Sequence, residues 1–234
     1  MDKTSLKLIT IDGPSGAGKG TASRELAYQL GWDFLDSGAL YRLTAYAAMQ
    51  KKIDLEDICA LVEVASTLDV EFKIEASHAD PDVFLEGQPV TLELRTEACS
   101  STASTISAYP AVRAALLQRQ RNFLTDIGLV ADGRDMGTVV FPHAPLKIYM
   151  TASPEVRAVR RHRQLLAQGI GVNMSHLLRD IIVRDQRDMS RAAAPLKPAE
   201  DALMLDTTEM DVTEVVQWIY RKAVDIWGEV ARPV

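Results

Sequence analysis

The stretch Ile9-Thr-Ile-Asp-Gly-Pro-Ser-Gly-Ala-Gly-Lys-Gly-Thr21 decides the fold class of this chain. It begins in an apolar run, Leu6–Ile11, that predicts a strand, and it opens Lys19–Leu30, whose apolar residues recur at helical spacing. The Gly-x4-Gly-Lys spacing from Gly13 to Lys19, between a strand and a helix, is that of a phosphate-binding loop (P-loop). Its glycines let consecutive backbone N–H groups face phosphate oxygens, and the helix N-terminus adds partial positive charge. The stretch therefore predicts a nucleotide site.

Two residues at the end of this loop bear on the chemistry. Lys19 is expected to place a full positive charge at the β and γ phosphates of a bound nucleotide. The next residue is Gly20, where most P-loops carry Ser or Thr, and Thr21 comes one position later. The hydroxyl that usually binds Mg²⁺ is thus in doubt, and we expect phosphate oxygens and water to hold most of the ion.

The composition is that of an ordinary globular protein and excludes several classes. Of 234 residues, 47% are hydrophobic and 25% charged, and no stretch approaches the roughly 18 apolar residues of a membrane span. The first apolar run contains Lys7 and stops at Asp12, unlike a signal peptide. Two cysteines, Cys59 and Cys99, are too few for a disulfide framework and are expected in the core. We therefore expect a cytoplasmic protein without membrane contact.

Charge is distributed unevenly along the chain. The formal net charge is −6, which argues against general nucleic-acid binding. Residues 113–191 nevertheless carry twelve Arg and one Lys against seven acidic residues, a local excess of +6. Such an Arg-rich excess favours a small polyanion held in a cleft. The alternative is a set of solvated helix faces.

Short apolar runs alternate with helical patterns, which predicts an α/β fold with a parallel sheet covered by helices. The expected strands are residues 6–11, 33–36, 129–132, 147–151 and 202–206. The expected helices are residues 19–30, 38–50, 55–67, 96–106, 111–123, 154–168, 175–187 and 212–227. By contrast, Asp69–Glu75 alternates between apolar and charged residues, and Val83–Val90 has the pattern of a hairpin. Residues 68–94 are therefore predicted to be a small antiparallel insert.

A second group of motifs follows the predicted strands. Asp36–Arg42 and Asp132–Thr138 each begin at the carboxyl end of a strand, where ligands bind in open α/β sheets. Arg42 and Arg134 are thus placed to meet one phosphate, although structural ion pairs are the alternative for each. Arg157 and Arg161, like Arg184 and Asp188, are four residues apart on predicted helices. These two helices predict a closing lid, with a solvated Arg–Asp surface as the alternative.

With these motifs in place, the chain resembles the bacterial cytidylate kinases, which are nucleoside monophosphate kinases with a P-loop. The resemblance covers nearly the whole chain and lies in residues 9–21, 36–42, 131–142 and 184–191, together with Ser104 and Arg113. It implies a P-loop kinase core over residues 1–37 and 107–234, with a short helical lid over about 154–191. It also implies a nucleoside-monophosphate-binding region over residues 38–106 that contains the β insert, about 68–94.

The resemblance further implies an activity: phosphorylation of CMP, and of dCMP, by ATP with Mg²⁺, in pyrimidine nucleotide metabolism. A monomer is expected. ATP would be bound by Gly13, Pro14, Ser15, Gly16, Ala17, Gly18, Lys19, Gly20, Thr21, Arg157 and Arg161. Ser37, Arg42 and Arg134 would lie near the CMP phosphate, Ser104, Arg113 and Asp135 near cytosine, and Arg184 and Asp188 near the sugar. Arg191 would lie at the reaction centre, and Lys19, Arg134, Arg184 and Arg191 would be catalytic.

The chemistry of cytosine agrees with these roles. The carboxylate of Asp135 would accept a hydrogen bond from the amino group, and Arg113 would donate to the ring acceptors. Uracil would present a carbonyl to that carboxylate, and sites built on such hydrogen bonds reject the wrong partner by about 10⁴-fold. Two alternatives are another small-molecule P-loop kinase, with UMP or a non-nucleotide acceptor, and a nucleotide-gated switch. A GTPase switch would carry Asn-Lys-x-Asp, which the sequence lacks.

Overall fold

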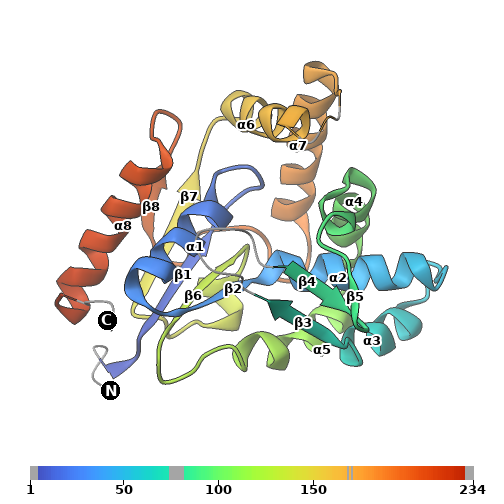
Figure 1. The fold of residues 1–234 in the computed structure, drawn as a ribbon, viewed down its shortest axis with the longest axis horizontal. Helices are drawn as coiled ribbons and strands as arrows, with labels where there is room; N and C mark the ends of the chain where they lie inside the picture. The colour runs from blue at the N-terminus through green and yellow to red at the C-terminus, as the bar shows by residue number, and fades with distance from the viewer. Residues whose placement is uncertain (1–4, 74–81, 168, 170, 230–234) are drawn as a thin grey trace. The chain divides into compact units, whose positions relative to one another are not determined.

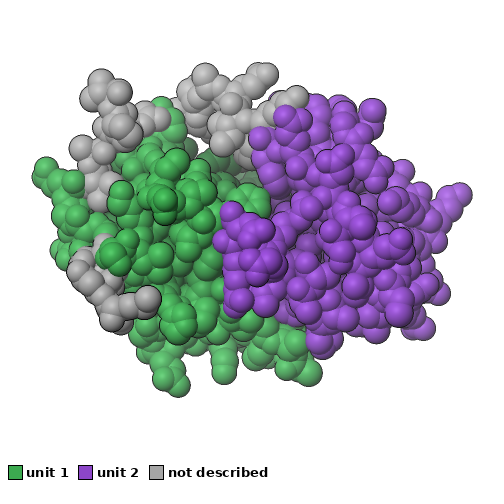
Figure 2. All heavy atoms as spheres, turned by 90° about the horizontal axis from the view of Figure 1, so that it is seen from below, with its two compact units in different colours: residues 1–35, 123–234 green, residues 36–122 purple. Residues whose placement is uncertain are grey.

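The computed structural model describes residues 5–73, 82–167, 169 and 171–229. The chain divides into two compact units, residues 1–35 with 123–234, and residues 36–122 (Figure 2). Among the described residues, no helix combines the length and apolar character that crossing a membrane requires.

The first unit is built on a five-stranded sheet in the order β2-β6-β1-β7-β8 (Figure 1). The strands are β1 (Leu8–Asp12), β2 (Asp33–Asp36), β6 (Leu129–Gly133), β7 (Leu146–Thr151) and β8 (Leu203–Asp206). The pairings of β1 with β6, β1 with β7 and β7 with β8 are all parallel. The α/β fold predicted from the alternation of strands and helices is confirmed.

Strand alternation gives the central strand β1 two different faces. Ile9 and Ile11 are fully buried in a cluster with side chains of α1 (Lys19–Leu30) and α8 (Val212–Trp227), and these two helices pack against each other. Because successive side chains of a strand point to opposite faces, Thr10 and Asp12 lie on the other face. That face supports one turn of π-helix, Met136–Val140, which we call the π-turn.

Helices α6 (Pro154–Ala167) and α7 (Met174–Ser190) pack against each other (Figure 1). The first begins at Pro154, as predicted, and the hydroxyl of Ser153 accepts a hydrogen bond from Val156 N at 3.3 Å. Between the two helices lies a small apolar cluster separate from the main core, formed by Ala158, Leu165, Leu177 and Ile181. The pair therefore carries its own core.

The second unit combines helices with a small sheet (Figure 1). Its helices are α2 (Ser37–Gln50), α3 (Ile58–Ser66), α4 (Glu97–Ile106) and α5 (Pro110–Arg121), with a short 3₁₀ helix at Glu93–Arg95. Its strands β3 (Val70–Lys73), β4 (Asp82–Leu85) and β5 (Gln88–Pro89) pair antiparallel, which confirms the predicted insert. Glu86 and Gly87 both have positive φ, 50° and 76°, as a two-residue hairpin turn requires. The end of the predicted strand 69–75 lies outside the described residues.

Three local features differ from the sequence-based expectation. Strand β1 begins at Leu8 and extends through Asp12, because residues 8–12 pair with β6 over their whole length. The π-turn after β6 was not predicted. Cys99 is buried as expected, but Cys59 is exposed, since the buried stripe of α3 runs through Leu61, Val64 and Ala65.

Candidate active site

Glycine conformation shapes the P-loop between β1 and α1. Gly13 has φ 147°, and a Cβ at this position would lie 2.0 Å from the carbonyl oxygen of Met150 on β7. Gly18 precedes α1 with φ 95°, in the left-handed region. The first N–H groups of α1 have no acceptor within the helix, as at any helix N-terminus. The loop thus has the backbone form that phosphate binding requires.

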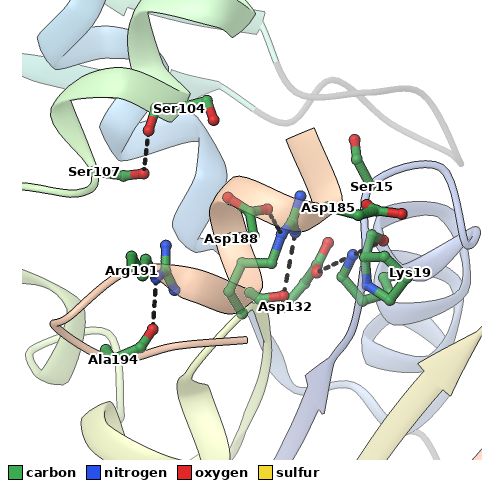
Figure 3. A network of polar contacts seen from close by, with 12 residues as sticks. Ser15, Lys19, Ser104, Ser107, Asp132, Asp185, Asp188, Arg191 and Ala194 are labelled. Atoms are coloured by element: carbon green, nitrogen blue, oxygen red, sulfur yellow. Dashed lines mark hydrogen bonds and ion pairs between the residues drawn. The ribbon is translucent and has the colours of Figure 1, made fainter. Parts of the chain in front are cut away.

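The Lys19 side chain folds back over this loop. It is buried, and its Nζ donates to the carbonyl oxygen of Pro14 at 2.9 Å. The same Nζ lies 3.8 Å from Asp132 Oδ1 at the end of β6 (Figure 3). A Cβ on Gly20 would lie 3.3 Å from Asp132 Oδ2, so the carboxylate also borders the start of α1. A cation and a carboxylate therefore stand together at the loop.

Two arginines of α6 donate hydrogen bonds to backbone carbonyl oxygens of the P-loop. Arg157 is buried and donates to the carbonyl oxygens of Ser15, at 3.0 Å, and Ala152, at 2.9 Å. It also forms a bidentate pair with Asp185 of α7, with N–O distances of 3.1 and 2.5 Å. Such forked pairs fix the guanidinium plane. Arg157 thereby ties the loop to α7.

Arg160 makes the second contact with the loop and was not singled out from the sequence. Its guanidinium donates to Ala17 O at 3.3 Å and to Thr207 O at 2.7 Å. The Thr207 hydroxyl itself donates to Ala17 O at 3.0 Å. Spacing of three residues places Arg157 and Arg160 on one helix face as well as spacing of four would, so the signal for Arg160 was present. Arg161 is half-buried.

Three arginines, Arg134, Arg184 and Arg191, lie around Asp188 of α7. Arg134, just after β6, donates through Nε to Asp188 Oδ2 at 2.9 Å. Burial by itself would raise the pKa of Asp188, but Arg134 and, to a smaller extent, Arg184 and Arg191 hold it below its usual value. The four predicted residues Arg134, Arg184, Asp188 and Arg191 therefore gather in one place. In this structure Arg134 forms the ion pair that the sequence left open as its alternative role.

Asp12 is a further buried carboxylate close to the P-loop. It accepts hydrogen bonds from the backbone N–H groups of Met136, at 2.8 Å, and Gly137, at 2.7 Å. Burial raises the pKa of Asp12 to about 7, although the two N–H bonds oppose the shift. Asp135, which the sequence assigned to cytosine, is buried immediately before the π-turn.

In the second unit, Arg42 and Ser37 lie at the start of α2. Arg42 Nη2 is 2.7 Å from Asp36 Oδ2, and Asp36 Oδ1 also caps α2 by accepting from Ala39 N at 3.0 Å. Ser37 is buried and donates to Gln120 Oε1 of α5 at 2.8 Å. Arg42 therefore forms an ion pair within its own unit, and both side chains are partly exposed.

Ser104 and Arg113 are joined through Ser107. The Ser107 hydroxyl donates to Ser104 O at 2.9 Å (Figure 3), and Arg113 Nη1 donates to Ser107 O at 3.1 Å. The Arg113 guanidinium also lies over the Tyr41 ring, 5.5 Å from its centroid. Both predicted base-contacting residues of this unit are buried and share one short network.

Comparison with known proteins settles the family. The model of the cytidylate kinase family matches residues 9–225. This chain belongs to the cytidylate kinase family. A cytidylate kinase of Pseudomonas aeruginosa (strain LESB58) is 56% identical over 214 residues, which are 92% of this chain and 93% of that protein. A cytidylate kinase of Shewanella baltica (strain OS155) is 55% identical over 210 residues, covering 89% of this chain and 91% of that protein.

Similarity to solved structures is distant. A gluconokinase of Sinorhizobium meliloti 1021 covers 95% of this chain and 91% of its own at 17% identity, with a TM-score of 0.44. No conclusion about activity rests on this likeness.

Within this member of the cytidylate kinase family, four polar residues at the site were missed by sequence reasoning. Asp12 and Asp185 belong to quoted motifs but received no role, while Arg160 and Thr207 lie outside them. All four act on other protein groups. Thr207 and Asp12 bond to backbone, Arg160 bonds to backbone and to Thr207, and Asp185 pairs with Arg157. Apart from Arg160, whose spacing from Arg157 was visible in the sequence, contacts of this kind depend on tertiary structure and leave little trace in local sequence.

Proposed function

We propose that the protein transfers the γ-phosphoryl group of ATP to CMP, and to dCMP, giving CDP or dCDP and ADP. The observation that carries the proposal is 56% identity to a cytidylate kinase over 92% of the chain. The geometry supports it, because a P-loop with a buried lysine and a cluster of three arginines occur within one unit.

The donor nucleotide is proposed to occupy the P-loop, Gly13–Thr21, with Arg157 and Arg161 of α6 assisting. Lys19 would exchange its bond with Pro14 O for the β and γ oxygens of ATP. This exchange needs only a small motion, because the ammonium already lies over the loop. Arg157 would keep the loop in shape through Ser15 O while its guanidinium edge adds positive charge.

The surroundings of the P-loop fit Mg²⁺. A carboxylate, Asp132, borders Lys19 and Gly20, and hard oxygen donors of this kind suit the ion. We propose that Asp132 is the protein group that would hold Mg²⁺, directly or through water, in place of the absent hydroxyl at position 20. When bound, Mg²⁺ neutralises charge on the β and γ phosphates.

The residues proposed to bind CMP are those that the resemblance to cytidylate kinases implied. Ser37, Arg42 and Arg134 would hold its phosphate, Ser104, Arg113 and Asp135 would read cytosine, and Arg184 with Asp188 would contact the sugar. The region expected to bind the nucleoside monophosphate, residues 38–106, falls within the compact unit of residues 36–122. Support comes from the network of Ser104 with Arg113 in one unit and of Arg134 with Asp188 in the other.

The proposed reaction is a direct displacement. An oxygen of the CMP phosphate attacks the γ phosphorus in line, a new P–O bond forms, and the bond to the β–γ bridging oxygen breaks as ADP leaves. The attacking oxygen is already anionic, so no general base is required. Lys19, Arg134, Arg184 and Arg191 would stabilise negative charge on the transferring group and the leaving oxygen. Helices α6 and α7, within the proposed lid of residues 154–191, would exclude water.

An ATP-coupled assay with CMP, dCMP, UMP, AMP or no acceptor tests this proposal. We expect rapid ADP formation with CMP and dCMP and slow formation in the other reactions. Preference for UMP would favour a different P-loop kinase, and acceptor-independent ATP hydrolysis would favour a nucleotide-gated switch.

We also propose that the enzyme acts as a cytoplasmic monomer on these small molecules, without nucleic acid or membrane. The net charge of −6 disfavours nucleic acid as a partner. Light scattering coupled to size exclusion should give a mass near 25.8 kDa, the mass of one chain; twice that mass would contradict the monomer.

A further inference from the structure

Asp12 connects the P-loop strand to the segment that follows β6. Its side chain is 4% exposed, and each carboxylate oxygen accepts one backbone N–H of the π-turn, from Met136 at 2.8 Å and Gly137 at 2.7 Å. Hydrogen bonds to an ionised acceptor are shorter and stronger than neutral ones. One side chain of β1 therefore holds two adjacent backbone amides of the π-turn.

The space between the π-turn and this face of the sheet leaves little room for a side chain at Gly137. A Cβ on Gly137 would lie 2.9 Å from Thr10 Oγ1, 3.2 Å from Lys147 Cδ and 3.3 Å from Asp12 Oδ2. These three side chains come from β1 and β7, on the sheet face that carries the π-turn. The turn therefore rests directly on the sheet, and its position depends on both Asp12 and the missing side chain at 137.

The π-turn in turn fixes the residues just before it. Its hydrogen bonds join residues five apart, as in a π-helix: Val140 N donates to Asp135 O at 3.1 Å, and Phe141 N donates to Met136 O at 2.7 Å. Asp135 has φ −146° and ψ 24°, so the chain leaves β6 through an irregular conformation. The bonds from Met136 N and Gly137 N to Asp12 anchor this irregular stretch of backbone to β1.

We propose that Asp12 is a positioning residue for the acceptor nucleotide: by clamping the π-turn it sets the placement of Arg134 and Asp135. This inference rests on the proposed function, because it takes those two residues as the groups that meet the CMP phosphate and cytosine. Asp12 directly precedes the P-loop, yet its replacement is expected to affect the use of CMP and the selectivity for cytosine over uracil. A role confined to the P-loop would instead affect ATP.

Replacement of Asp12 by Asn separates these effects. The amide keeps the shape of the carboxylate but presents an NH₂ donor to one of the two backbone N–H groups. For Asp12→Asn we expect kcat/KM for CMP to fall by about tenfold and the CMP/UMP ratio to fall by a similar factor, with KM for ATP within about twofold. Gly137→Ala, whose methyl group would push the same turn away from the sheet, should lower the same two quantities. Asp225→Asn, on the exposed face of α8, serves as the matched control.

Hydrogen exchange of the free protein provides a readout that needs no substrate. In Asp12→Asn the peptide that spans residues 134–141 should exchange faster, while peptides of α8 should be unchanged. Unchanged exchange at Met136 and Gly137 would overturn the clamp, whatever the enzyme phosphorylates. A rise in KM for ATP with CMP kinetics unchanged would also overturn it, and would assign Asp12 to the P-loop. Wild-type protein that phosphorylates no CMP would overturn the proposed function and with it the acceptor role, even if the exchange result showed that the clamp exists.

Discussion

At the residue scale, the site depends on charged side chains that are buried and already bonded to protein groups. Lys19 bonds to Pro14 O, Arg134 to Asp188, and Arg157 to Asp185. A charge held in this way would need little rearrangement on binding substrate phosphate, as proposed, because its position is fixed in advance. The protein groups bonded to these side chains therefore set the positions of the charges in the site.

Replacement of Lys19 by Met should lower kcat by about 10³-fold, because it removes a positive charge where negative charge develops. Met keeps the apolar length of the side chain, so the circular dichroism spectrum and the melting temperature should change little. Steady-state assays with saturating ATP and CMP provide the measurement. A variant with near-normal turnover would remove Lys19 from the catalytic group.

Asp12 should make stability depend on pH in a defined direction. Its pKa is about 7 in the folded protein and near the ordinary value of 3.8 when unfolded, so the folded state binds the proton more tightly. Stability from this group is present below about pH 4 and is lost as pH rises through 7. Urea unfolding of wild type and Asp12→Asn at several pH values should therefore show the wild type losing stability relative to the variant between about pH 4 and 7, with little further change above that. A pH-independent difference would contradict the raised pKa.

At the element scale, α6 and α7 are joined to the P-loop through Arg157. This arginine bonds at once to Ser15 O and to Asp185, which is adjacent to Arg184 and three residues from Asp188. Movement of α7 would therefore also displace the P-loop, where ATP is proposed to bind. The two helices also share their own apolar cluster, as the proposed movement of the pair as a lid requires.

Replacement of Asp185 by Asn should weaken this connection. Loss of the charged partner of Arg157 is expected to raise KM for ATP by about tenfold, since a hydrogen bond to a charged group is lost in a buried setting. Asp180→Asn, at an exposed position of the same helix, is the matched control. Initial-rate kinetics with varied ATP provide the test, and equal behaviour of the two variants would argue against the connection.

Most helices and strands could be predicted, because local sequence patterns mark where they begin and end. Helix α1 has the predicted bounds because its apolar stripe and the flanking glycines, Gly18 and Gly31, mark both ends. The π-turn was missed because its amides bond to Asp12, which lies 124 and 125 residues away in the chain. No local pattern in residues 136–140 encodes that partner.

At the scale of the whole molecule, the proposed site draws on residues from distant parts of the chain. The basic excess of residues 113–191 was visible in the sequence, and three of its arginines do gather around Asp188. The ion pairs of Arg134 with Asp188 and of Arg157 with Asp185 could not be assigned from the sequence, because several acidic and basic residues lie close together in residues 184–191 and several pairings were possible.

Replacement of Asp135 by Ala should lower the selectivity for CMP over UMP more than it affects the use of ATP. Its carboxylate is proposed to accept from the cytosine amino group, which uracil lacks. We expect the ratio of kcat/KM for CMP to that for UMP to fall by about 10²-fold, with KM for ATP nearly unchanged. Parallel assays with the two acceptors provide the measurement, and an unchanged ratio would remove Asp135 from base recognition.

The most direct test of the central claim is the binding of a bisubstrate analogue in which adenosine and cytidine are joined through five phosphates. If the P-loop and the arginine cluster act on one phosphoryl transfer, calorimetry should show one analogue per chain, displaced by ATP and by CMP alike. Lys19→Met and Arg134→Ala should each weaken that binding. An analogue that competes with only one of the two nucleotides, or that binds as two independent molecules per chain, would contradict the account.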